Sequence, residues 1–194
     1  MTDQKLQSPL HISKVSYCQV SYDNDKGNWD SHIGFDEVDL AIEIELQDKQ
    51  GYTITWEQIE APGKDTSVTL LQCHTGLLYS SSEEHKKQIW DVTDTKYWKK
   101  VVNVPIAQFN FYSPQEYMFS RTDIFSEVEI TFENKVTSVI VCAEYIEPSL
   151  YRFFDRIAVV FDDKLLKINN LGKYNKSLKV VCKYSINGES PQME

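Results

Sequence analysis

The clearest pattern along the chain is an alternation of apolar and polar residues between Asp36 and Glu60. Apolar side chains fill every second position before a turn at Asp48–Gly51 and resume after it: Val38, Leu40, Ile42, Ile44, Leu46, Tyr52, Ile54 and Trp56. A strand with one buried and one solvent-facing side has this period of two. The segment therefore predicts an antiparallel hairpin.

A similar hairpin follows in the second half of the chain. Residues 43–49 align with residues 129–135, and Glu57–Glu60 aligns with Glu144–Glu147 when one residue is added to the second copy. Two flanking strands align as well, residues 12–17 with residues 106–111 and residues 68–71 with residues 158–161. Four predicted strands thus recur in the same order.

Two interpretations of this similarity stay open. Any two amphipathic hairpins agree at their apolar positions, so the match is also what two unrelated hairpins would give. The alternative is a tandem duplication with halves at 10–73 and 104–162. The number of residues between aligned segments changes from one pair to the next, however, whereas a strict repeat would keep a fixed period. If the duplication is real, the halves should pair about a pseudo-two-fold axis and bury each other's strand edges.

The strict alternation stops between these halves. Residues 80–103 contain two helix-start patterns and predict a helical insertion with short helices near 82–90 and 94–102. Ser113 and Pro114 predict another brief helix, and residues 177–185 predict a C-terminal strand. The expected fold is mainly β, with two antiparallel meanders packed as a sandwich or a partly closed barrel and two or three short helices covering an open end.

Composition restricts the class of protein. The 194 residues suit a single compact domain, 1–194, and the hydrophobic fraction of 41% is ordinary for a globular chain. The formal net charge of −9 disfavours nucleic acid and anionic membranes and favours a basic partner. The only arginines are Arg121, Arg152 and Arg156, so recognition of phosphate by guanidinium groups is not a general feature.

The ends and the cysteines bear on location. The first residues, 1–14, are polar and do not resemble an export or lipidation signal, and no apolar run approaches the ~20 residues needed to cross a bilayer. We therefore expect a cytoplasmic protein. Its four cysteines are far apart and lie in or beside apolar segments, so they are expected to be buried thiols: Cys18, Cys73, Cys142 and Cys182.

The duplicated glutamates are the main candidates for chemistry. Two carboxyl groups about 5–9 Å apart can share acid and base roles in glycoside hydrolysis. Residues three apart on a strand face opposite sides, so only a pair drawn from both copies, Glu57 and Glu144, could act together. Solvated strand ends are the alternative interpretation, and in that case Glu60 and Glu147 belong to an acidic binding surface.

Metal and cofactor sites are not predicted. The loop Asp23–Asp30 is rich in Asp but carries Asn28 and Gly34 where a calcium loop needs Gly and Glu, so an ordinary turn is expected. Cys73, His74 and His85 do not have the spacing of a tetrahedral zinc site. The chain also has no glycine-rich phosphate loop, and we expect no cofactor.

Aromatic residues are the remaining candidates for binding. Tyr97 and Trp98 could anchor a partner, but an apolar helical stripe is usually part of a core, and we favour the core interpretation. Trp29 lies in a polar loop and is expected to be exposed.

The sequence is compatible with three functions and does not settle whether the protein is an enzyme, although we favour a role without catalysis. The first is an acidic interaction protein that binds a basic protein, as an inhibitor or an immunity protein does. The second is a small-molecule-binding β-barrel. The third is a hydrolase that uses the paired glutamates. The sequence does not determine the oligomeric state.

Overall fold

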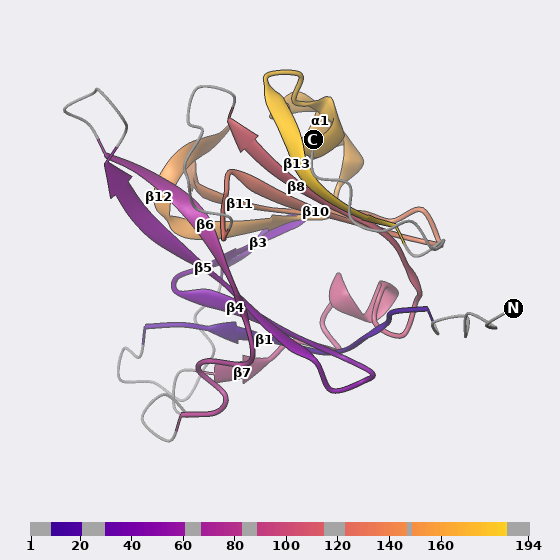
Figure 1. Ribbon diagram of the computed structural model, residues 1–194. Helices are drawn as coiled ribbons and strands as arrows, with labels where there is room; N and C mark the ends of the chain where they lie inside the picture. The colour runs from indigo at the N-terminus through magenta and orange to yellow at the C-terminus, as the bar shows by residue number, and fades with distance from the viewer. Residues whose placement is uncertain are drawn as a thin grey trace, which may run out of the picture.

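The computed structural model describes residues 9–20, 30–60, 67–82, 89–114, 123–146 and 149–185, which form two antiparallel sheets (Figure 1). In spatial order, the six-stranded sheet contains β7 (Ile89–Asp91), β1 (Ile12–Cys18), β4 (Ala41–Leu46), β5 (Gly51–Glu60), β6 (Ser67–Thr75) and β9 (Ile124–Phe125). The seven-stranded sheet contains β13 (Leu178–Ser185), β8 (Ile106–Pro114), β10 (Glu127–Phe132), β11 (Thr137–Ile146), β12 (Ser149–Val160), β3 (Phe35–Val38) and β2 (Asp30–Ser31).

The two sheets share one hydrophobic core. The alternating apolar residues of β4 point into it together with those of β10, β11 and β12, including Ile42, Ile44, Ile130, Ile140 and Ile157. These five side chains are at most 2% exposed. The prediction of a mainly β fold with two packed meanders is confirmed, and of the two architectures left open the sandwich is correct, because neither sheet closes on itself.

The strand order within the sheets is the same in both halves of the chain. The neighbours β1, β4, β5 and β6 in one sheet correspond to β8, β10, β11 and β12 in the other. Each half also has a shift in the pairing of its first two strands at the matching place, next to Ser13 in one and next to Ala107 in the other.

The two central hairpins turn in the same way. Lys49 and Lys135 occupy equivalent positions and both have a left-handed backbone, with φ of 69° and 68°. In each turn an Asx side chain accepts a hydrogen bond from the backbone two residues later, from Gln50 to Asp48 at 3.0 Å and from Val136 to Asn134 at 3.1 Å. Asp and Asn favour such turns because their short side chains bond the local backbone.

The halves also exchange one short strand each. The strand β3 comes before β4 in the first half but pairs with β12 of the second half, and β9 comes before β10 in the second half but pairs with β6 of the first. Each exchanged strand covers part of an edge that its partner hairpin would otherwise expose.

The alignment predicted from sequence needs two corrections in the outer strands. Leu71 lies opposite Trp56, and Ile157 lies opposite Cys142, so Leu71 corresponds to Ile157 and not to Phe161. The predicted alignment was thus displaced by four residues in this strand, and β12 also contains an irregularity in which residues 153–156 have no partner on β11. By the same register, Glu57 corresponds to Ala143 rather than to Glu144.

The segment between the halves is less helical than expected. Around the predicted helix 94–102 the chain forms turns and a single 3-10 helix, η2 (Trp98–Lys100), which lies at one end of the sandwich (Figure 1). Side-chain oxygens here bond the backbone instead of favouring a helix: Thr95 donates to the Val92 carbonyl at 2.7 Å, and Thr93 accepts from the Val15 amide at 3.1 Å.

The other helix predictions have different outcomes. Most of the predicted helix 82–90 lies outside the described residues, but its last two residues belong to β7 and pair with β1. Ser113 and Pro114 end β8, so they do not begin a helix, and residues 115–122 lie outside the described ranges. The predicted C-terminal strand is present as β13.

One α-helix was not predicted. The helix α1 (Asp163–Ile168) follows β12, and its N-cap Asp162 accepts a hydrogen bond from the Leu165 amide at 3.0 Å. Residues 169–171 connect it to the 3-10 helix η3 (Gly172–Tyr174). Together they cover the outer face of the seven-stranded sheet, where Leu166 and Leu171 pack on Val139, Val141, Ala143, Ala158 and Val160.

We expect the described thiols to be unreactive in the folded protein. Burial raises the pKa of Cys73 to about 12, with the Asp123 charge adding to the effect, and burial also raises the pKa of Cys18 and Cys142. All three thiols therefore stay protonated near pH 8, where the thiolate is the reactive species. In a Cys182→Ser variant, Ellman's reagent should modify them only on unfolding. Rapid modification in native buffer would contradict this, and denaturant supplies the positive control.

Candidate functional site

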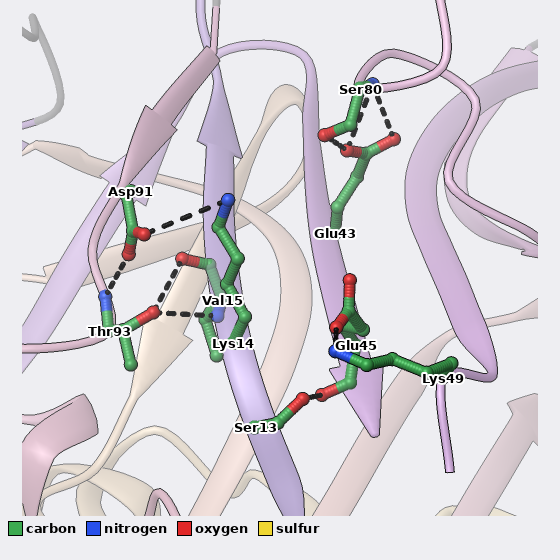
Figure 2. Close-up of polar contacts among 9 residues, drawn as sticks. All are labelled: Ser13, Lys14, Val15, Glu43, Glu45, Lys49, Ser80, Asp91 and Thr93. Carbon is green, nitrogen blue, oxygen red and sulfur yellow. Dashed lines mark hydrogen bonds and ion pairs between the residues drawn. The ribbon is translucent and has the colours of Figure 1, made fainter. Parts of the chain in front are cut away.

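Buried carboxylates on the outer faces of both sheets each accept several hydrogen bonds. Glu43 of β4 is 2% exposed, and its carboxylate accepts a hydrogen bond from the Tyr79 amide at 2.7 Å. It also accepts from the Ser80 amide at 3.1 Å and from the Ser80 hydroxyl (Figure 2). The Thr53 hydroxyl donates a further bond at 3.3 Å. Glu43 thereby fastens the segment that follows β6 to the sheet.

The second half repeats this arrangement at the equivalent position. Glu129 of β10 is 3% exposed and accepts from the Lys173 amide at 2.7 Å and the Asn110 side chain at 2.8 Å. Lys173 belongs to η3, in the segment that follows β12. Gly172 beside it has a positive φ, and a side chain there would collide with the Glu129 carboxylate, so glycine lets the backbone approach closely.

A third buried carboxylate is paired with an arginine. Glu127 is fully buried, forms an ion pair with Arg152 of β12, and accepts hydrogen bonds from the Gly172 amide and from Asn175 at 3.3 Å. A buried charge needs such partners, because transfer from water is otherwise strongly unfavourable. The Arg152 side chain therefore lies on the outer face of the seven-stranded sheet, where it points toward the buried Glu127 carboxylate.

A hydrogen-bonded chain crosses the end of the core near η2. Trp98 donates to the Tyr17 hydroxyl at 2.6 Å, and Tyr17 donates to Asp36 of β3 at 2.8 Å. Burial, together with the Asp36 charge, raises the pKa of Tyr17 well above its usual value, so this hydroxyl keeps its proton. The neighbouring Tyr97 hydroxyl donates to the His32 carbonyl and accepts from the Gly34 amide.

These hydrogen bonds hold Tyr97 and Trp98 at the end of the core. They are 5% and 0% exposed, and both rings pack against Phe161, with centroids 5.2 Å and 5.0 Å away. Their location is the one that the core interpretation predicts. Neither ring offers a surface to a partner.

Exposed apolar side chains gather instead at the far end of the β11–β12 hairpin. Ile146 is 48% exposed, Tyr151 49% and Phe154 36%. Glu144 is half-buried and Asp155 is exposed in the same part of the hairpin. We call these five residues the tip surface. Large apolar side chains clustered in this way are typical of a binding site.

The tip surface lies where the two halves differ. Residues 153–156 are the four residues of β12 that have no partner on β11, and the equivalent hairpin of the first half, β5–β6, pairs without interruption from Tyr52 to Glu60. Phe154 and Asp155 belong to this irregularity. The architecture of the sandwich does not require them, because β6 performs the same structural role without extra residues.

The structure places the predicted glutamate pair on different faces. Glu57 is three residues from Ile54, which points into the core, so Glu57 lies on the outer face of its sheet. Glu144 is two residues from Cys142, which also points into the core, so Glu144 lies on the inner side of the other sheet. This arrangement does not bring the two carboxylates together.

The other predicted binding residues are scattered. Glu60 is exposed at the end of β5, whereas Glu147 and Trp29 lie outside the described residues, as does the loop at 23–29. Sequence reasoning missed Ile146, Tyr151 and Phe154. The signal that could have found them is the aromatic-rich segment Tyr151–Phe154, which lies just before the predicted strand at residues 158–161.

Comparison with known proteins does not assign this arrangement to a class. No protein-family model, no curated protein and no solved structure matches the chain significantly. Among the described residues, no group of three His, Cys, Asp or Glu side chains is arranged to hold a metal ion. Every helix in the described ranges is too short or too polar to span a membrane.

Replacing Glu43 should destabilise the fold strongly. In Glu43→Ala the amides of Tyr79 and Ser80 lose a buried charged acceptor, and we expect the free energy of unfolding to fall by about 2–4 kcal/mol. Glu45→Ala is the matched control, because Glu45 lies two residues along the same face and makes an exposed ion pair with Lys49 that contributes about 0.5 kcal/mol or less. Urea unfolding measures both, and equal losses would contradict the structural role of Glu43.

Proposed function

We propose that this protein is a non-enzymatic interaction protein that binds a basic protein partner through its tip surface. The observation that carries the proposal is the exposure of Ile146, Tyr151 and Phe154 on a single hairpin end. Aromatic side chains supply most of the binding energy in protein interfaces, because they bury large areas with few rotatable bonds.

The charges around the tip favour a basic partner. Glu144 and Asp155 belong to the tip surface, whereas the two arginines of β12 are paired with carboxylates elsewhere: Arg152 with Glu127, and Arg156 with Asp39 at 3.7 Å. The net charge of −9 adds a long-range attraction for cations. The same charge opposes association with a second copy of this chain.

The buried carboxylates support a binding role over catalysis. Glu43, Glu127 and Glu129 each accept hydrogen bonds from the backbone of a covering segment. Carboxylates engaged in this way stabilise the fold and do not present a free acid or base to a substrate. A tandem duplication accounts for the equivalent positions of Glu43 and Glu129, and we propose that the tip surface arose when the second half gained the extra residues of β12.

The proposal predicts that the tip is needed for capture of a partner from the native host. Wild-type protein should retain a basic protein at about 0.01 M salt and release much of it near 0.15 M, over which the Debye length falls from ~30 Å to ~8 Å. The double variant Tyr151→Ala, Phe154→Ala should bind that same partner on the order of 30-fold more weakly. Quantitative pull-down followed by calorimetry with the purified partner measures this.

Tyr52→Ala supplies the matched control. Tyr52 is 37% exposed and lies at the start of β5, in the other sheet, so its loss removes a similar exposed aromatic from a different surface. The control should keep the affinity of the wild type. Equal binding by the double variant and the wild type would refute the tip as the binding surface.

A further inference from the structure

We propose that Tyr151 and Glu144 form a binding site for a cationic side chain, a guanidinium or an ammonium group, presented by the partner. The site rests on the proposed function and specifies the chemistry by which the tip surface recognises a basic protein. The pairing of β11 with β12 places the two side chains together, and no cation from the described residues occupies the position between them.

The pairing of β11 and β12 places the two side chains next to each other. Glu144 lies directly opposite Tyr151 in the antiparallel register. Directly opposite residues share a face of the sheet, and their Cβ atoms are about 4.5–5.5 Å apart. A carboxylate and a phenol ring therefore stand side by side, and Ile146, two residues from Glu144, extends the same face.

This pair combines two groups that attract a cation. The face of an aromatic ring carries negative potential because of its quadrupole, and Arg and Lys groups bind over it. The adjacent carboxylate adds a direct charge and can accept a hydrogen bond from an ammonium or guanidinium group. Tyr151 is 49% exposed, so about half of its surface is accessible to a partner.

The protein does not fill this site with its own charges. Among the described residues, none forms an ion pair or hydrogen bond with the Glu144 carboxylate, and none places a cation over the Tyr151 ring. Other tyrosines differ, because Lys96 lies 5.1 Å from the Tyr97 ring centroid and Lys173 lies 5.2 Å from that of Tyr174.

The arginine next to Tyr151 is directed away from the site. Arg152 lies opposite Ala143, so its side chain is on the opposite face of the sheet from Tyr151 and contacts Glu127 there. The ion pair with a fully buried carboxylate holds it there. A cation that binds Glu144 and Tyr151 must therefore come from another molecule.

The test is an NMR titration of the full chain with N-acetyl-arginine amide, and with N-acetyl-citrulline amide as the uncharged analogue of the same shape. The arginine compound should shift the backbone signals of Glu144 and Tyr151, and the citrulline compound should not. Tyr151→Leu, which keeps apolar area but removes the ring, should weaken binding about two- to five-fold. Tyr151→Phe should bind like the wild type, and Glu144→Gln should bind more weakly.

The variant Tyr52→Leu controls for unspecific effects and should leave the titration unchanged. Equal shifts with the arginine and citrulline compounds, no shift with either, or wild-type binding by Tyr151→Leu would each overturn the cation site. Those results leave the proposed function standing if the double tip variant still loses the basic partner. If the double variant keeps the partner, the proposed function fails independently of the titration.

Discussion

The structure depends on the fact that the apolar faces of the two sheets have only each other to pack against. Each central hairpin carries one apolar and one polar side, and a single hairpin of this kind is at best marginally stable in water. Pairing the two sheets buries Ile44 of one half and Ile130 of the other in the same core. Hydrophobic burial of this kind supplies most of the favourable free energy of folding.

The outer faces are stabilised by a different interaction. There the strands present glutamates, and the segments that follow the fourth strand of each half present backbone amides to them. The alternating pattern predicts that Glu43 and Glu129 face solvent. Because covering segments bond to them, they instead form part of a second buried layer. Burying each carboxylate has a desolvation cost, which its hydrogen bonds to backbone amides offset. In return, each carboxylate holds in place a loop that has little apolar surface of its own.

Much of the fold was predictable because alternation directly reports which side of a strand is buried. The hairpins, their order and the sandwich follow from that pattern, and Lys49 and Lys135 mark equivalent turns. The outer burial of Glu43 was not predictable, because a glutamate on the polar side of a strand is normally solvated. Its acceptor role depends on a segment more than thirty residues away.

The candidate site was largely hidden from the sequence for a related reason. The alignment of residues 68–71 with residues 158–161 begins after the irregularity of β12, so the unpaired residues 153–156 did not stand out. Tyr97 and Trp98 drew attention as aromatic neighbours, but the partners that bury them, Tyr17 and Phe161, come from distant parts of the chain. The burial of Tyr97 and Trp98 therefore depends on tertiary contacts that the local sequence does not show.

The exchange of β3 and β9 has a consequence for how the molecule assembles. Because β3 belongs to the sheet of the second half and β9 to that of the first, the first sheet cannot complete its native pairing until the chain has been synthesised as far as β9. Contacts so distant in sequence slow folding, since a long loop must close before they form. They also connect the two halves by strand pairing in both directions, so each sheet contains residues from both halves.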